Sequence, residues 1–357
     1  MRNYLVILIL CIFGSCSEME EQRVFSDVKI ETIYTDSLSF RAIEIMDGGN
    51  MAFAANKGAF GLVDLRSNKV RVNTQKYDSI LPEFRAVAQN STDFFMLSIG
   101  NPALLYKTGD KGNMELVYKE EDEKVFYDAM TFWNDQEGIA VGDSMNGCLS
   151  IIITRDGGST WKKISCSSLP KSETGEGAFA ASNTNIKVLG TMAWIGTTHG
   201  NVYHTKDKGL TWEVIKTPIT SAETTQGIFS IDFYDENLGT VIGGDYAEPV
   251  LNTGNKAVTM DGGKTWKLIA DGQLPNYRSC VQFVPNSNGK SLVAVGFEGI
   301  AYSYDIGETW KQLSDESFYT LRFMNDTIAY AAGKDCEANF SLICYGIEKD
   351  DVLIDGL

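Results

Sequence analysis

Histidine is almost absent from this chain of 357 residues, with only His199 and His204 present. A Ser-His-Asp arrangement has little support, because His204 is expected inside a strand and His199 in a tight turn. The sequence also lacks a Gly-x-Gly-x-x-Gly run, a Cys-x-x-Cys pair and a Cys-x-x-Cys-His motif. These absences give no support to a nicotinamide, dithiol or haem site. We expect neither a cofactor nor a metal ion.

Positive charge is also scarce, since 31 Lys and Arg residues face 47 Asp and Glu residues, for a net charge of −16. An acidic surface repels phosphate backbones, so we expect no nucleic-acid partner. After the N-terminal segment no apolar run reaches about 18 residues, so we expect no transmembrane helix. Only seven Pro residues occur and no long amphipathic helical period appears, which favours an all-β chain.

The cysteines match no zinc-binding spacing. Cys11 lies in the N-terminal apolar run and Cys16 directly after it, which leaves five: Cys148, Cys166, Cys280, Cys336 and Cys344. Cys336 and Cys344 could face each other across one hairpin and pair in an oxidising compartment. Free thiols are the open alternative.

The N-terminus is typical of an export signal, with Arg2 followed by the apolar run from Tyr4 to Phe13. The residues Gly14-Ser15-Cys16 resemble the lipobox of bacterial lipoproteins. That resemblance implies removal of residues 1–15 and lipidation of Cys16; an ordinary signal peptide is the alternative. The stretch Ser17-Glu18-Met19-Glu20-Glu21 looks like the acidic tag of some surface lipoproteins. We therefore expect a lipid-anchored protein of the cell envelope, in the outer membrane, with the periplasmic or surface side left open.

An eight-residue pattern, [Ser/Thr]-x-Asp-x-Gly-x-Thr-Trp, begins at Thr154, Thr205, Thr259 and Ser303. Lys107–Gly112 is similar to a decayed fifth copy. The physics is that of a tight hairpin, in which a carboxylate accepts bonds from its own loop, Gly takes a positive φ, and Trp anchors the turn. The pattern is the Asp-box (BNR) signature, which implies a structural role for Asp156, Trp161, Asp207, Trp212, Asp261, Trp266, Asp305 and Trp310.

Strand-like segments precede and separate these turns. Seven runs predict the first strands of seven four-stranded blades: Ser39–Ile43, Glu83–Val87, Phe126–Met130, Gly177–Ala181, Gly227–Ile231, Tyr277–Val281 and Phe318–Arg322. Second strands of small and β-branched residues, such as Gly138–Gly142, fit near a crowded axis. We expect a seven-bladed β-propeller over residues 27–350, closed by the N-terminal strand Asp27–Thr35, after a tether at 16–26 and before a tail at 351–357. Closure would remove exposed sheet edges.

The blades resemble the Ycf48/Hcf136-like assembly-factor propellers. A closer likeness is to bacterial propellers that carry names such as oxidoreductase or BNR-repeat glycosyl hydrolase. The residues that carry it are Gly138–Asp143, Gly175–Ser182, Gly227–Ile231, Gly243–Tyr246 and Tyr277–Val281. The resemblance implies a seven-bladed ring but no settled activity.

Blade topology predicts where a site would lie. Successive strands of a blade run in opposite directions. The starts of the first strands and the ends of the second strands therefore meet at one mouth of the central channel, on the face opposite the Asp boxes. The predicted ligand-binding residues are Arg41, Arg85, Asp128, Asp143, Glu176, Asp245, Tyr246 and Arg278. They could bind a sugar, a carboxylated ligand or a peptide, since Arg suits carboxylates. Alternatively, the charges pair with one another and fill the channel.

The function we expect is a monomeric binding or assembly module for an envelope protein or glycan. The alternative is a glycosidase, which needs two carboxylates at a controlled separation; Asp128, Asp143, Glu176 and Asp245 are candidates. Sialidases share the Asp box and use three Arg, which Arg41, Arg85 and Arg278 could imitate, but no Tyr–Glu nucleophile pair can be assigned. Oxidoreductase activity would rest on the inherited name alone.

Overall fold

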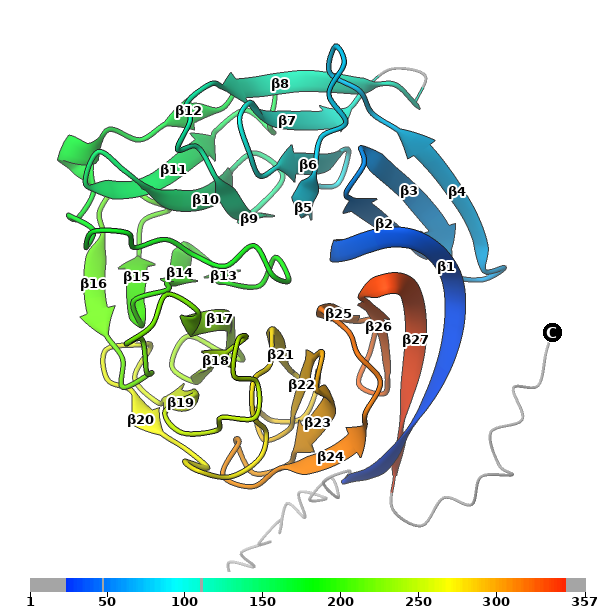
Figure 1. Ribbon diagram of the computed structural model, residues 1–357, viewed down its shortest axis with the longest axis vertical. Helices are drawn as coiled ribbons and strands as arrows, with labels where there is room; N and C mark the ends of the chain where they lie inside the picture. The colour runs from blue at the N-terminus through cyan, green and yellow to red at the C-terminus, as the bar shows by residue number, and fades with distance from the viewer. Residues whose placement is uncertain (1–23, 47, 110–111, 345–357) are drawn as a thin grey trace, which may run out of the picture.

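The computed structural model of the protein describes residues 24–46, 48–109 and 112–344. Antiparallel four-stranded sheets stand around a central axis like the blades of a propeller (Figure 1). A 3-10 turn at Cys166–Ser168 interrupts the strand-rich chain. In the part of the chain that the structure describes, no helix has the length and apolar character needed to cross a membrane. Cys16, the start of the tether and the tail at 351–357 lie outside the described residues.

Five sheets have four strands each, which follow one another from the axis outwards. The first two contain β5 (Phe84–Gln89), β6 (Phe94–Ser98), β7 (Ala103–Thr108), β8 (Met114–Glu120), then β9 (Tyr127–Phe132), β10 (Gly138–Met145), β11 (Cys148–Thr154) and β12 (Lys162–Lys163). The third contains β13 (Ile186–Leu189), β14 (Met192–Gly196), β15 (Asn201–Thr205) and β16 (Glu213–Lys216). The others contain β17 (Gln226–Phe233), β18 (Gly239–Asp245), β19 (Lys256–Thr259), β20 (Lys267–Leu268), then β21 (Cys280–Phe283), β22 (Leu292–Gly296), β23 (Gly299–Ser303) and β24 (Lys311–Ser314).

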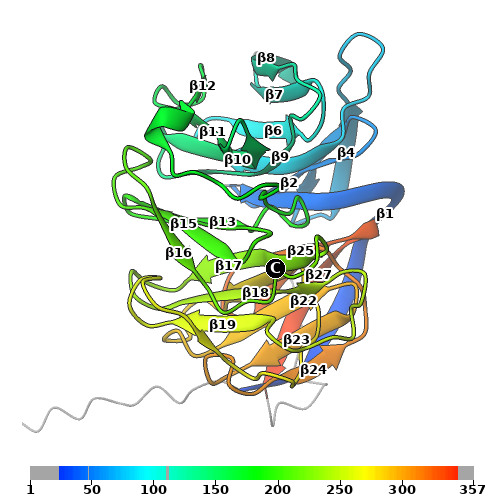
Figure 2. The same ribbon diagram turned by 60° about the vertical axis from the view of Figure 1, so that its left-hand side comes forward.

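The sixth sheet joins both ends of the chain. Its order is β25 (Thr320–Phe323), β26 (Ile328–Ala332), β27 (Lys334–Cys344), β1 (Phe25–Met46), β2 (Asn50–Ala55), β3 (Ala59–Asp64) and β4 (Lys69–Thr74). The first part of β1 pairs with β27, from Phe25 opposite Cys344 to Ser39 opposite Lys334, and its second part pairs with β2. Figure 2 shows β1 running from the outer edge of one group of strands to the inner edge of the next.

The hydrophobic core lies between neighbouring sheets. One cluster combines Phe95 of β6 with Met130 and Ile152 of the next sheet, and another combines Phe40 and Phe53 with Tyr330. Second strands are almost completely buried, for example β22, whose side chains from Leu292 to Val295 are all inaccessible to solvent. Small and β-branched residues pack well where strands converge on the axis, so every blade depends on its neighbours.

Each Asp-box turn joins the third and fourth strands of a sheet. In the first, Asp156 accepts bonds from the Thr160 N–H (2.9 Å), the Thr160 hydroxyl (2.7 Å) and the Thr154 hydroxyl (2.8 Å). The same three bonds recur at Asp207, Asp261 and Asp305. Gly158 has φ +84° and a Cβ there would lie 2.2 Å from the Phe95 ring, so only glycine fits.

The segment Gly177–Ala181, predicted as a first strand, is not one. Its sheet begins instead at Ile186, and residues 177–185, which we call the crossing segment, run through the middle of the ring (Figure 1). Asn183 donates to the Val87 carbonyl (2.7 Å) and accepts from the Met130 N–H (2.9 Å). A run of small residues can therefore fill the channel as well as form a strand beside it.

Further bonds tie the crossing segment to the remaining sheets. The Ser182 hydroxyl donates to the Ser279 carbonyl (2.7 Å), and the Ser182 carbonyl accepts from the Thr320 hydroxyl (2.8 Å). The Thr184 carbonyl accepts from the Ile231 N–H (2.8 Å). These groups of Ser182 and Thr184 thus find partners in the surrounding sheets, as buried backbone groups must, whereas the buried side chain of Asn185 has no hydrogen-bond partner in the structure.

A disulfide joins Cys148 at the start of β11 to Cys166, with Cα atoms 5.5 Å apart. It fixes the connection that leads into the crossing segment. Cys336 and Cys344, whose pairing the sequence left open, do not face each other across a hairpin, because both residues lie on the single strand β27. Eight residues of strand separate their Cα atoms by roughly 26 Å, far beyond the reach of a disulfide.

Replacing Trp161 by Ala is expected to lower the free energy of unfolding by about 3–5 kcal/mol. The Trp161 ring is 6% exposed and contacts Phe95 and Phe132 edge to face, so the truncation would leave a cavity between two blades. Chemical denaturation measures the change. The exposed neighbour Lys162, replaced by Ala, serves as the control and is expected to stay within about 0.5 kcal/mol. An unchanged midpoint in Trp161→Ala would contradict the anchoring role.

Replacing Asn183 by Ala is expected to cost about 2–5 kcal/mol, because one buried N–H and one buried carbonyl on different sheets would lose their partners. Asn237→Ala, at an exposed turn position, is the matched control. Thermal and denaturant unfolding would test the difference. Equal stability of the two variants would show that the crossing segment does not hold the ring together.

Candidate functional site

The channel has two ends, which the strand order defines. Because the strands are antiparallel, the turns joining third to fourth strands lie on one face, here called the Asp-box face. The starts of the first strands and the connections from second to third strands lie on the opposite face, here called the mouth face. The crossing segment lies between the two ends and closes the channel.

A row of five aromatic rings lines the mouth. Phe179 of the crossing segment stacks on Phe229 of β17, with ring centroids 3.7 Å apart. Tyr277 follows at 4.9 Å from Phe229, and Phe297 stacks on Tyr277 at 4.6 Å. Tyr246 packs edge to face against both Phe179 and Phe229 and is 48% exposed. Of these rings only Tyr246 was predicted as a site residue. Phe179, Phe229 and Tyr277 fall in the runs predicted to open the first strands, and Phe297 directly follows the second strand β22.

The loop after Tyr246 adds exposed apolar side chains to the same face. Val250 is 67% exposed and Leu251 is 50% exposed, and the Pro249 carbonyl accepts from the Tyr277 N–H at 3.1 Å. Leu274, in the connection to the next sheet, is also exposed. Aromatic and aliphatic groups gathered at the surface are typical of a binding surface.

Arg41 lies at the mouth without a carboxylate partner among the described residues. Its guanidinium stacks over the Tyr319 ring, 4.2 Å from the centroid, and its Nη1 reaches the Ala181 carbonyl only at 3.5 Å. Its Nε is buried with no hydrogen bond in the structure. Burial and the neighbouring charge of Arg85 lower the pKa of Arg41. A largely buried cation without an anion is costly, so an anionic ligand would be favoured here.

Arg85 is paired differently, because its Nε donates to Glu83 at 2.7 Å. Behind it, Asp128 is completely buried, and both of its carboxylate oxygens lack hydrogen-bond partners in the structure. Burial, with the nearby charge of Asp143, raises the pKa of Asp128 well above its usual range. Burial raises the pKa of Asp143 to about 6, and the Ala178 N–H donates to its Oδ1 at 3.2 Å.

Two of the predicted residues shape the mouth from within. Glu176 is buried and accepts from Thr197 (2.8 Å), Asn201 (2.9 Å) and Tyr203 (3.0 Å). Asp245 is 5% exposed, and its Oδ1 accepts from the Ala247 N–H at 2.9 Å, which sets the turn that presents Tyr246. The carboxylate oxygens of Glu176 and Asp245 are thus engaged in hydrogen bonds within the protein and position the mouth from inside.

Arg278 comes just before β21, but its side chain is buried inside the protein and does not reach the surface of the mouth. It is completely buried and donates to the Tyr277 carbonyl (2.8 Å), Asn276 (3.0 Å) and Gln312 (2.7 Å), the last on the outermost strand of its blade. The structure therefore does not gather the three Arg of a sialidase-like site. Asp128, one of the four carboxylates considered for a glycosidase, is completely buried and has no access to a substrate.

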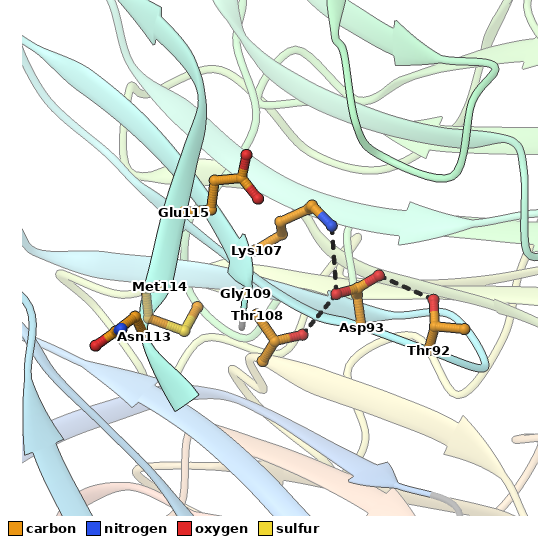
Figure 3. Close-up of a pocket in the computed structure, with 8 residues that line it drawn as sticks. All are labelled: Thr92, Asp93, Lys107, Thr108, Gly109, Asn113, Met114 and Glu115. Carbon is orange, nitrogen blue, oxygen red and sulfur yellow. Dashed lines mark hydrogen bonds and ion pairs between the residues drawn. The ribbon is translucent and has the colours of Figure 1, made fainter. Parts of the chain in front are cut away.

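The Asp-box face has a separate hollow at the decayed Asp box (Figure 3). Asp93, from the neighbouring turn, accepts from the hydroxyls of Thr92 and Thr108 at 2.8 Å each and lies 3.5 Å from Lys107 Nζ. The hollow is otherwise lined by Gly109, Asn113, Met114 and Glu115. The Asp93 carboxylate already has partners in these neighbouring residues. We therefore place the candidate site at the mouth and not in this hollow.

No family model and no curated protein matches the sequence. Solved structures match the fold over most of its length. Ycf48 bound to a D1 peptide aligns with a TM-score of 0.64 and 12% identity, covering 90% of this chain and 98% of that one. Ycf48 from Cyanidioschyzon merolae aligns with 0.62 and 14%, covering 88% and 99%. A catalytically inactive virginiamycin B lyase from Staphylococcus aureus, with quinupristin, aligns with 0.67 and 13%, covering 89% and 100%. The chain is a β-propeller, similar in fold to these proteins.

Proposed function

We propose that the protein is a lipid-anchored envelope propeller whose mouth binds an extended segment of a partner protein. The observation that carries the proposal is Arg41, a cation without a carboxylate partner among the described residues, at the same mouth as a group of aromatic rings that includes the exposed Tyr246. A peptide carboxylate would pair with Arg41, and neighbouring apolar side chains would pack on Tyr246 and Val250. Among the structural neighbours, a Ycf48 structure contains a bound peptide, which makes this use of the fold plausible.

The architecture behind this proposal is a ring of seven blades. We interpret the seven-stranded sheet as two blades joined through β1, which would be the fourth strand of the last blade and the first strand of the first. The four complete Asp boxes would then be scaffold, because their carboxylates are occupied by their own turns. A rigid ring of this kind holds its mouth in place, and preorganised sites lose less entropy on binding.

The envelope location is supported by two independent features. The lipobox-like Gly14-Ser15-Cys16 favours export and lipidation, and disulfides such as Cys148–Cys166 persist mainly in oxidising compartments outside the cytosol. We propose anchoring at Cys16 in the outer membrane.

Substituting Ala for Cys16 is expected to abolish lipid attachment, since the thiol is the acceptor in a lipobox. The mature parent should partition into Triton X-114 and incorporate labelled palmitate, whereas the variant should do neither. Cys280→Ala, which removes a buried thiol far from the N-terminus in sequence, is the control and should remain in the detergent phase. Detergent partition of the Cys16→Ala variant equal to that of the parent would contradict the anchor.

Photo-crosslinking on intact cells tests the binding mouth. A benzoyl-phenylalanine residue at position 246 should capture a defined protein, whereas the same residue at Val214, an exposed position on the outer strand β16, should not. Adding Arg41→Ala is expected to weaken capture about ten- to hundredfold, the value of a lost charge-assisted contact. Arg71→Ala, at an exposed position on β4, is the matched charge control.

The outcomes separate the alternatives. Capture that glycosidase treatment abolishes would indicate a glycan at the mouth instead of a peptide. Equal capture from positions 246 and 214, or full capture with Arg41→Ala in a variant of parental melting temperature, would refute the mouth as the binding site.

A further inference from the structure

The Asp-box end of the channel contains a second cavity, of about 180 Å³. Six polar side chains reach it from the innermost strands: Glu44, Thr131, Lys187, Asp232, Gln282 and Arg322. Asn183 and Thr184 of the crossing segment also line it. Because that segment fills the channel between the two ends, a ligand in this cavity would not touch the mouth.

The cavity carries four full charges that sum to zero. Arg322 Nη2 lies 3.4 Å from Glu44 Oε1, and Lys187 Nζ lies 2.6 Å from Asp232 Oδ1. The Arg322 and Asp232 side chains are only 13% and 8% exposed. A ligand with net charge would leave an uncompensated ion in this sheltered place, which is costly. The lining therefore favours a ligand that is neutral overall.

The polar groups of the cavity are incompletely satisfied. Both Nε and Nη2 of Arg322 reach the same oxygen of Glu44, at 3.4 Å each, which is long for a charge-assisted hydrogen bond. Within the described part of the chain, no hydrogen bond reaches the other oxygen of Glu44. The same holds for the side chains of Gln282 and Thr131. The cavity thus offers an incoming molecule a charged donor and a charged acceptor, in Arg322 and Glu44. It also offers the neutral polar side chains of Gln282 and Thr131.

We propose that this cavity binds a small zwitterion of the free amino acid class. Its carboxylate would lie between Arg322 and Lys187, and its ammonium group would lie against Glu44 and Asp232, so that each charge meets its opposite. Gln282 and Thr131 would bind the remaining polar atoms. The cavity volume of about 180 Å³ is small, so the candidates are the smallest amino acids, glycine, alanine and serine.

Isothermal titration calorimetry on the full mature protein tests the proposal, with L-alanine, L-serine and glycine as probes. Acetate, methylamine and glycerol carry one charge or none and serve as matched probes. The amino acids are expected to bind and the three matched probes to bind at least about tenfold more weakly, the value of one lost charge-assisted contact. Glu44→Gln and Gln282→Leu are expected to weaken alanine binding about tenfold or more.

Two control variants locate the site. Gln136→Leu, at an exposed turn on the same face, and Arg41→Ala, at the mouth, should leave alanine binding unchanged. Because Arg41→Ala affects only the mouth, failure of this inference and failure of the peptide-binding function are distinguishable. If Glu44→Gln does not fold, then Gln282→Leu and Thr131→Val carry the test, since neither side chain bonds to the described protein.

Three results would overturn the inference. The first is the absence of binding for all three amino acids up to about 10 mM, a Kd too weak for a built site. The second is glycerol binding as tightly as alanine, which would indicate a polyol site. The third is alanine binding that persists in Gln282→Leu and Thr131→Val variants with parental melting temperatures.

Discussion

The segment Ser182–Thr184 lies where the innermost strands of the ring face one another, and its backbone and side chains bond to β9, β17 and β25. The channel along the axis of such a ring is too narrow to contain a hydrophobic core of its own. It is lined by polar groups that need hydrogen-bond partners. The Asn183 side chain meets both requirements at once, bridging β5 and β9. Its φ of 59° is one that Asn tolerates better than most residues. The relative placement of the blades, and with it the geometry of both channel ends, depends on this small group of hydrogen bonds.

The crossing segment also explains why the two ends differ in chemistry. At the mouth it contributes Phe179, which extends the aromatic row from Phe229, and the Ala181 carbonyl near Arg41. At the Asp-box end it contributes only polar and small groups beside balanced ion pairs. A single segment of chain thus converts what would be one water-filled channel into an apolar, cationic surface and a separate, electrically neutral cavity.

The repeated turns were the most readable part of the sequence, because their residues interact within eight positions. The bonds of Asp156 and the positive φ of Gly158 follow from local chemistry alone. The crossing segment was misread as a strand because Gly177–Ala181 has the small and aromatic composition of the true first strands. What distinguishes it is contact with residues far away in the chain, such as Val87 and Ser279. The Cys148–Cys166 disulfide escaped prediction for the same reason, since a whole Asp-box turn separates its two cysteines.

Arg278 was placed at the mouth because the register of its strand was read one residue off. In two other blades, the residue at the mouth lies three positions before the residue that lines the cavity at the Asp-box end. These pairs are Arg41 with Glu44 and Tyr319 with Arg322. By the same spacing from Gln282, the corresponding residue is Ser279, just before β21, and not Arg278. Side chains alternate along a strand, so a slip of one position turns a side chain from the axis into the space between blades. Arg278 occupies the place that Phe40, Phe84 and Phe318 occupy in other blades, and all four are buried.

Asp128 is in the axial register but lies beneath Ala178, whose N–H donates a hydrogen bond to the neighbouring Asp143. Strand order alone could therefore locate the mouth. It could not tell which residues reach a ligand there, because that depends on the register of each blade and on the path of the crossing segment.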